Sequence, residues 1–304
     1  MVAKNNENIQ KVVKKALMPV AGFGTRFLPA TKAQPKEMLS LVDKPVIQYL
    51  VEEVSNSGIK EIIFVTGRGK RAIEDHFDFS FELEYILHKK GKKDLLKKIL
   101  PIPKLAKFSY VRQPQPLGNG DAILRAKHLI RNEPVAVVFG DDLTISNPPL
   151  LSRLIKAYNK FSAPIVSLYK IPLKDTKRYG VVDGIKIEKN IYKINKVVEK
   201  PRNNPPSNLI IIGEFIITPK VISYIEKLAK IIKKKKSNKE IGLAEALSLY
   251  IKDGYPVYGY LFEGERYDCG NKIGFLQATV SLALKNKETK DDFKKFLKEI
   301  VKKI

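Results

Sequence analysis

Cysteine, histidine and long apolar runs are scarce in this 304-residue chain, and each scarcity excludes a class of protein. Cys269 is the one cysteine, so no disulfide can form within the chain, and we expect a reducing, cytoplasmic compartment. His76, His88 and His128 share no spacing with cysteines or carboxylates that is typical of a zinc site. Because no apolar run approaches the roughly 18 residues of a membrane span, and residues 1–15 lack the apolar centre of a signal peptide, we expect no contact with a membrane.

Acidic residues are also few, since 32 aspartates and glutamates face 56 lysines and arginines, giving a formal charge of +24. Such an excess is typical of nucleic-acid-binding proteins. The lysines are dispersed, however, over separate clusters that include residues 89–93, 233–236 and the tail after residue 285, and no nucleic-acid-binding signature accompanies them. We interpret them as solvated helix faces, expect no nucleic-acid partner, and expect the positive field to steer anionic nucleotides toward a cleft.

The most informative stretch is residues 16–38, in which an apolar run ends in a loop with two glycines, Gly22 and Gly24. The cations Arg26 and Lys36 follow the loop. Because glycine has no side chain, backbone N–H groups in such a loop approach a phosphate closely, and nearby cations neutralise its oxygens. The loop lacks the third glycine of a dinucleotide fingerprint and the Gly-Lys-Ser/Thr of a Walker loop. It therefore predicts a nucleotide site of a different kind.

Apolar strands alternate with helical patterns along the chain, which predicts an α/β fold with a Rossmann-like, doubly wound mixed sheet and helices on both faces. The expected strands cover residues 12–21, 61–66, 108–112, 135–139, 163–169, 191–199, 209–217 and 257–263, with a hairpin turn at Asp183-Gly184. The expected helices cover residues 44–58, 70–77, 79–100, 121–130, 149–159, 221–233, 241–252, 273–284 and 291–302. Because ligands bind beyond the carboxyl ends of strands in such sheets, Gly22, Gln113 and Asp141 should meet at one edge.

The pattern G-x-G-T-R-x-x-P-x-T-x-x-x-P-K of residues 22–36 resembles the sugar-nucleotide pyrophosphorylases, and its flanks look most like the bacterial UTP–glucose-1-phosphate uridylyltransferases. Further segments that carry the resemblance are Q-P-Q-P-L-G-N-G at 113–120, F-G-D-D at 139–142, V-E-K-P at 198–201 and Y-D-C-G at 267–270. It implies transfer of a uridylyl group from UTP to glucose 1-phosphate, yielding UDP-glucose and pyrophosphate without a covalent intermediate.

We expect a single nucleotidyltransferase domain at residues 13–304 after a disordered tail at residues 1–12. Its nucleotide half would cover about 13–145 and its sugar-phosphate half about 146–285, with C-terminal helices to residue 304. The resemblance also implies a homo-oligomer, either a dimer or a tetramer.

The implied reaction holds two anions in line, so it needs cations and a divalent metal rather than a covalent nucleophile. The resemblance assigns Arg26 to the leaving pyrophosphate and Lys36 to the UTP phosphates. It implies that Asp141 and Asp268 hold one Mg²⁺, because carboxylates are hard oxygen ligands. Asp142 is the adjacent candidate, and the sequence leaves the choice between the two neighbours open.

The same resemblance implies that Gln113 reads the uracil edge by donating and accepting hydrogen bonds. Glu199 would accept hydrogen bonds from sugar hydroxyls, and Lys200 would act as a catalytic cation that binds the sugar phosphate. Further substrate contacts are expected at Ala21, Gly22, Gly24, Thr25, Gly118, Tyr179, Gly180 and Gly213.

Three positions depart from the family pattern. Asp121 stands where a histidine is usual, Asn271 stands where an acidic residue is frequent, and Gly242 lies in a segment, residues 239–245, that replaces a G-E-I-Q-L-T-D-like stretch. The last of these departures matters most, and it bears on substrate preference and oligomer geometry rather than on the reaction class. The alternatives are the same chemistry with dTTP, CTP or another sugar 1-phosphate, and a catalytically silent regulatory homologue, which should have lost at least one of the catalytic residues.

Overall fold

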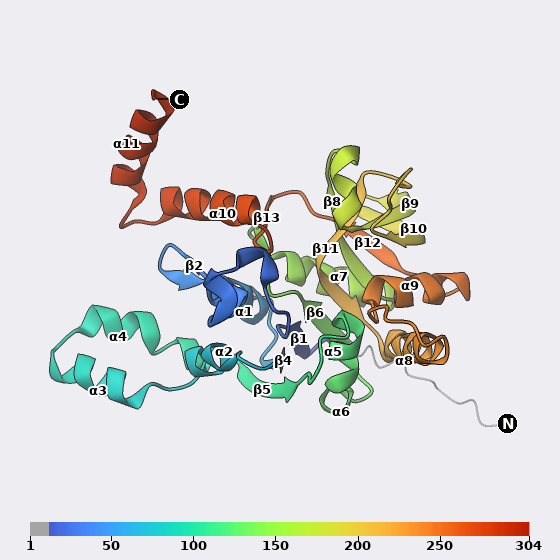
Figure 1. Ribbon diagram of the computed structural model, residues 1–304, viewed down its shortest axis with the longest axis horizontal. Helices are drawn as coiled ribbons and strands as arrows, with labels where there is room; N and C mark the ends of the chain where they lie inside the picture. The colour runs from blue at the N-terminus through green and yellow to red at the C-terminus, as the bar shows by residue number, and fades with distance from the viewer. Residues whose placement is uncertain (1–11, 304) are drawn as a thin grey trace.

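One long mixed sheet forms the centre of the protein (Figure 1). The computed structural model describes residues 12–303, so the predicted disordered tail lies, except for its last residue, outside the described residues. Within them the nine-stranded sheet has the order β5-β4-β1-β6-β11-β8-β12-β10-β9. Its strands are β1 (Lys15–Pro19), β4 (Glu61–Thr66), β5 (Lys107–Arg112), β6 (Val135–Val138), β8 (Ile165–Lys170), β9 (Gly180–Glu188), β10 (Ile191–Glu199), β11 (Leu209–Ile217) and β12 (Tyr258–Leu261).

The first four strands of the sheet are parallel, and the later ones are mixed. β1 pairs with β4 and β6 in parallel, and β4 pairs with β5 in parallel. β11 then runs antiparallel to both β6 and β8. The carboxyl ends of β1, β4, β5 and β6 therefore point to one edge, where ligands bind in sheets of this kind.

Helices pack on both faces of the sheet, and the side chains of β1 show why. Ala16 and Met18 belong to one buried core, while Leu17 between them belongs to the other, because successive side chains of a strand point to opposite faces. The first core includes α1 (Val46–Asn56), α2 (Arg71–His76) and α7 (Leu150–Phe161). The second includes α5 (Asn119–Arg125), α6 (Lys127–Ile130), α8 (Pro219–Lys234) and α9 (Leu243–Lys252). The predicted doubly wound architecture is confirmed.

Two pairs of helices extend away from the sheet. α3 (Phe81–Lys89) and α4 (Lys93–Ile99) form an arm beyond α2, and α10 (Lys272–Lys285) leads to the projecting α11 (Lys290–Val301) (Figure 1). The helical excursion expected at 79–100 is therefore two helices, which separate at Gly91 with its positive φ of 65°.

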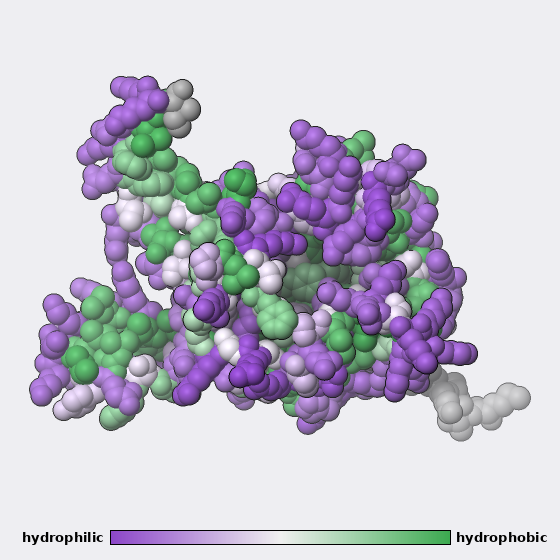
Figure 2. All heavy atoms as spheres, viewed as in Figure 1, coloured by the Kyte–Doolittle hydropathy of each residue, from purple (hydrophilic) through white to green (hydrophobic). Residues whose placement is uncertain are grey.

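Apolar side chains gather on these projecting helices, as the green patches of Figure 2 show. Exposed examples are Phe81, Tyr85 and Leu95 on the arm and Phe296 on α11. Among residues 12–303, no helix is long and apolar enough to cross a membrane.

One sequence prediction about the turns is wrong. Asp183 and Gly184 do not form a hairpin turn, because β9 continues through them to Glu188 and the chain reverses before Ile191. The ladder shifts register at this point, because Asn195 of β10 has no partner between Gly184 and Asp183, so Gly184 lies opposite a bulge in the neighbouring strand.

A small ribbon that the sequence did not predict completes the edge of the sheet. It pairs β7 (Asp142–Ile145) with β13 (Glu265–Asp268), and its register sets Asp268 opposite Asp142. Short remaining elements are β2 (Ser40–Leu41), β3 (Lys44–Pro45) and 3-10 helices at Thr25–Phe27, Ala30–Lys32, Lys36–Met38, Ile102–Lys104 and Leu173–Arg178. The ribbon brings the two expected acidic segments together, although they are distant in the sequence.

Candidate active site

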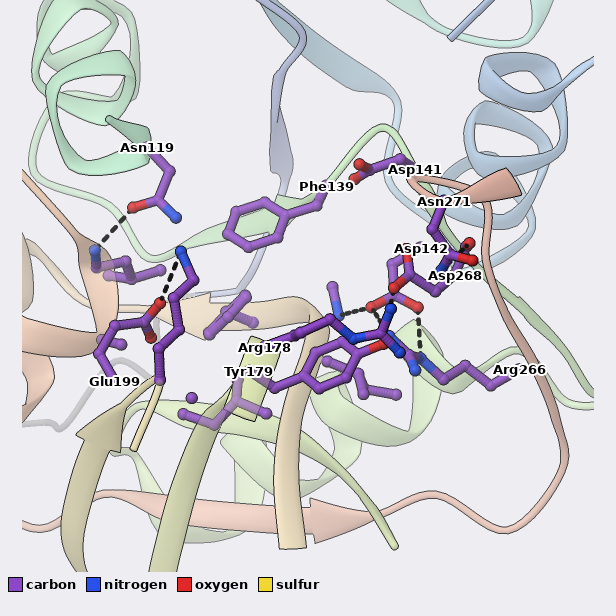
Figure 3. A pocket seen from close by; sticks show the side chains of 18 of the residues that line it. Asn119, Phe139, Asp141, Asp142, Arg178, Tyr179, Glu199, Arg266, Asp268 and Asn271 are labelled. Carbon is purple, nitrogen blue, oxygen red and sulfur yellow. Dashed lines mark hydrogen bonds and ion pairs between the residues drawn. The ribbon is translucent and has the colours of Figure 1, made fainter. Parts of the chain in front are cut away.

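A cavity of about 380 Å³ lies where the ribbon meets β6 and β11 (Figure 3). Asp141, Asp268 and Arg266 lie toward one end of it, and Glu199 and Asn119 lie toward the other. The expected site residues that line it are Arg26, Asp141, Tyr179, Gly180, Glu199, Lys200, Gly213 and Asp268. The cavity thus joins residues from the glycine loop, the F-G-D-D segment, the V-E-K-P segment and the Y-D-C-G segment.

The two neighbouring aspartates have different surroundings. Asp142 accepts hydrogen bonds from Arg266 Nε at 2.7 Å and Nη2 at 2.8 Å, and from the Gly213 N–H at 2.9 Å. Those bonds connect β7, β13 and β11, so both oxygens of the Asp142 carboxylate are already occupied in holding these strands together. Both aspartates line the cavity, but Asp141 is paired with the Lys36 ammonium group and makes none of these scaffold bonds. The geometry therefore favours Asp141 as the carboxylate available to a ligand.

The charge state of Asp141 follows from this pairing. Burial acts to raise the pKa of Asp141, but the positive charges of Lys36 and Arg26 outweigh it and hold the pKa below its ordinary value. Burial likewise acts to lower the pKa of Lys36, and Asp141 and Glu37 outweigh it, so the pKa of this lysine is raised. Both groups are therefore charged at neutral pH.

Asp268 lies close to Asp141 at the same end of the cavity. Its Oδ2 accepts a hydrogen bond from the Tyr179 hydroxyl at 2.7 Å, and its Oδ1 accepts one from the Gly270 N–H at 3.0 Å. A Cβ atom built on Gly270 would collide with Asp141 Oδ2 and lie 3.0 Å from Asp268 Oδ1. The absence of a side chain at Gly270 thus leaves a space that both carboxylates border, with Arg26 donating to the Gly270 carbonyl at 3.2 Å.

The other end of the cavity is formed by the end of β10. Lys200 has a left-handed backbone, with φ of 44°, and its Nζ lies 3.5 Å from Glu199 Oε1. Burial raises the pKa of Glu199, an effect that the Lys200 charge opposes. Gly180 packs against Glu199, since a Cβ there would lie 3.1 Å from Glu199 Oε2. These residues present a carboxylate and an exposed cation on the same wall.

The remaining expected residues lie outside the lining of this cavity, on the neighbouring loops. They are Ala21, Gly22, Gly24, Thr25, Lys36, Gln113 and Gly118. Ala21 and Gln113 follow β1 and β5, and the Gln113 N–H donates to the Thr66 carbonyl of β4 at 2.8 Å. The carboxyl ends of the parallel strands therefore do gather these segments at one edge, as the sequence predicted.

The segment around Ile241, which departs from the family pattern, packs against the loop that contains Gly118. The Ile241 N–H donates to the Leu117 carbonyl, and the Gly120 N–H donates to the Ile241 carbonyl, each at 2.8 Å. Gly118 has φ of 103°, and a Cβ there would lie 2.6 Å from the Ile241 carbonyl oxygen. This position therefore requires glycine, both for its backbone conformation and for its close packing.

Sequence reasoning missed two buried or cavity-lining cations, Arg266 and Arg178. Burial acts to lower the pKa of Arg266, but Asp142 outweighs it and raises the pKa. The signals were present, since Arg266 precedes the Y-D-C-G segment and Arg178 precedes Tyr179-Gly180.

Asn271, one of the departures, caps α10 by accepting a hydrogen bond from the Gly274 N–H at 2.9 Å. An asparagine can therefore fill the structural role of this position.

The comparisons with known proteins agree with this geometry. Residues 15–285 match a family model described as nucleotidyl transferase. A curated relative, the UTP–glucose-1-phosphate uridylyltransferase of Staphylococcus haemolyticus, is 46% identical over 95% of this chain and 99% of its own. A crystal structure of UDP-glucose pyrophosphorylase complexed with UDP-glucose is 41% identical, with a TM-score of 0.81 over 90% of this chain and 100% of that one. A UTP-bound enzyme of the same kind from Acinetobacter baumannii is 36% identical, with a TM-score of 0.86 over 95% and 99%.

Proposed function

Because the chain belongs to the nucleotidyl transferase family, we propose that it transfers a uridylyl group from UTP to glucose 1-phosphate. A phosphate oxygen of glucose 1-phosphate attacks the α-phosphorus of UTP. The bond from that phosphorus to its bridging oxygen breaks, and pyrophosphate leaves with the electron pair. The observation that carries the proposal is the cavity itself, with Asp141 at one end, paired with Lys36 from the neighbouring loop, and with Glu199 and Lys200 at the other end.

The role of the nucleotide end is to hold charge in place. Arg26 and Lys36 neutralise the UTP phosphates and the developing charge on pyrophosphate, which are interactions that strengthen in the transition state. The Lys36 ammonium group pairs with Asp141. When UTP binds, its phosphates offer this lysine alternative partners. No nucleophilic side chain is required, because the attacking oxygen belongs to the substrate.

The residues fit a divalent cation, a cofactor that proteins of this family generally use. Asp141 and Asp268 border one common space above Gly270, and Asp141 is held ionised. Among residues 12–303 there is no cluster of three or more metal-binding side chains. Two carboxylates suit Mg²⁺, which takes one or two from the protein and completes its shell with phosphate oxygens and water. When bound there, Mg²⁺ would offset phosphate charge and polarise the α-phosphate.

At the sugar end, Glu199 accepts hydrogen bonds from the glucose hydroxyls, and Lys200 binds the phosphate of glucose 1-phosphate. Gly180 packs beside Glu199, and Tyr179 and Gly213 continue the wall toward Asp268 and Asp142, with which they form hydrogen bonds. On the nucleotide side we place Ala21, Gly22, Gly24, Thr25, Gln113 and Gly118.

We assign about residues 13–145 to the nucleotide half and 146–285 to the sugar-phosphate half of a single domain. The continuous sheet supports this assignment.

Lys200→Ala tests the sugar-phosphate assignment. The KM for glucose 1-phosphate should rise roughly ten- to a hundredfold, the value of a charge-assisted hydrogen bond, while the KM for UTP changes little. Steady-state kinetics with each substrate varied in turn measures both constants. Lys196→Ala is the matched control, since that exposed lysine lies on β10, four residues before Lys200, and does not line the cavity. A defect confined to UTP would assign Lys200 to the other substrate.

The reaction itself is tested by pyrophosphate release. Purified protein receives UTP, glucose 1-phosphate and Mg²⁺, and each component is omitted in turn. Release that requires all three, with UDP-glucose as product, is the expected result. Substitution of dTTP or CTP for UTP, and of other sugar 1-phosphates for glucose 1-phosphate, separates the alternatives that share the chemistry. UTP binding without any release would instead favour a catalytically silent homologue.

We also propose a cytoplasmic homo-oligomer, a dimer or tetramer, that binds neither nucleic acid nor membrane. The lone cysteine supports a reducing compartment, and it is buried. The exposed apolar side chains of α3, α4 and α11 support association between copies of the chain.

A further inference from the structure

The base-reading glutamine has both of its donors engaged inside the protein. Gln113 is buried, and its Nε2 donates to the Gly118 carbonyl at 3.1 Å and to Asp121 Oδ2 at 2.8 Å. A primary amide has only two N–H donors. Its carbonyl oxygen is therefore the only hydrogen-bonding group of this side chain that remains for a ligand.

Asp121 fixes which way the amide points. This aspartate is 5% exposed and lies in the first turn of α5, where Arg125 one turn later pairs with it at 3.2 Å. An ionised carboxylate accepts hydrogen bonds but donates none. If the Gln113 amide were reversed, its oxygen would face two acceptors, the Asp121 carboxylate and the Gly118 carbonyl. The reversed amide would lose both hydrogen bonds and gain two repulsive contacts.

We propose that Asp121 is a positioning residue that sets base selectivity by holding the Gln113 carbonyl oxygen toward the nucleotide base. The proposal rests on the proposed function and concerns its nucleotide preference. A lone acceptor favours a base with an imino N–H at its pairing edge, as uracil and thymine have at N3. Cytosine has an acceptor at N3, so its lone pair would oppose the fixed carbonyl. UTP and dTTP are therefore accepted at this contact, and CTP is rejected.

The test compares UTP with CTP in pyrophosphate release for the wild type, Asp121→Asn and Asp121→Leu. Asparagine can donate to a reversed Gln113 amide, and leucine removes one of the two acceptors that hold it. We expect the ratio of kcat/KM for UTP to that for CTP to fall about tenfold, as the loss of one oriented hydrogen bond predicts. Asp94→Asn on α4 is the control, since its exposed side chain lies on the projecting arm.

A double-variant comparison shows whether Asp121 acts through Gln113. Gln113→Leu should lower the same ratio, and adding Asp121→Asn to it should produce no further fall. A merely structural role would reduce kcat/KM for both nucleotides by one factor and leave the ratio unchanged. A ratio that stays within about twofold of wild type in the folded Asp121 variants overturns the proposal. Absence of UDP-glucose synthesis by the wild type would instead overturn the proposed function.

Discussion

Asp141→Asn is expected to lower kcat at least about a hundredfold, the scale of losing a preorganised charged group at the reacting phosphates. The amide has nearly the same shape as the carboxylate, but it carries no charge for a divalent cation or for Lys36. Stability should change little, because the side chain is partly exposed at the cavity and lies outside both apolar cores. Pyrophosphate release at saturating substrates measures the effect, and thermal unfolding checks the fold.

The pH dependence of the wild type gives a second measurement on the same residue. Burial would raise the pKa of Asp141, but Lys36 and Arg26 outweigh it and hold the pKa below its ordinary value. The carboxylate is therefore charged at neutral pH and loses its charge only as the pH falls through the lowered pKa. Activity between pH 6 and 9 should show no titration from Asp141. Asp94→Asn is the control, because it makes the same substitution at an exposed aspartate on the arm. Near-normal turnover of Asp141→Asn would remove Asp141 from the proposed metal site.

Lys70→Met is expected to destabilise the protein by about 3–5 kcal/mol, because it leaves the Glu37 carboxylate buried without its cation. The Lys70 and Glu37 side chains are 5% and 1% exposed, and Lys70 Nζ lies 2.8 Å from Glu37 Oε2. This pair ties the turn that contains Lys36 to the segment after β4. Urea unfolding followed by circular dichroism measures the change in the free energy of unfolding.

A double variant separates the loss of the pair from the loss of packing. Glu37→Met combined with Lys70→Met removes both charges, and it should recover at least half of the lost stability, since an apolar pair of similar volume replaces a buried ion pair well. Lys97→Met is the matched control, because Lys97 pairs with Asp94 at 3.3 Å on an exposed helix face and should matter by less than about 1 kcal/mol. If Lys70→Met and Lys97→Met lowered the free energy of unfolding by the same amount, the predicted cost of leaving Glu37 buried without its cation would be wrong.

Local patterns in the sequence were sufficient for most of the fold. The strands at Glu61–Thr66 and Leu209–Ile217 begin and end where the apolar runs predicted, because burial on both faces requires continuous apolar residues. The strand at Ile191–Glu199 also has the predicted bounds, which followed from its alternating pattern. The hairpin at Asp183-Gly184 was wrong, because an Asp-Gly pair favours a turn locally but pairing with β10 continued the strand through it. Tertiary pairing outweighed the local preference there.

The sequence by itself determined the family, the chemistry of the segments and their gathering at the carboxyl ends of the parallel strands. Only the tertiary structure distinguished the surroundings of Asp141 from those of Asp142, because the difference depends on Arg266, which lies 124 residues after Asp142 in the chain. The structure also decided the orientation of Gln113, which is set by acceptors further along the same β5–α5 loop and on α5 itself. A residue's type and spacing fix what its side chain can do. Its partners, brought close by folding, fix which of its groups remains for a ligand.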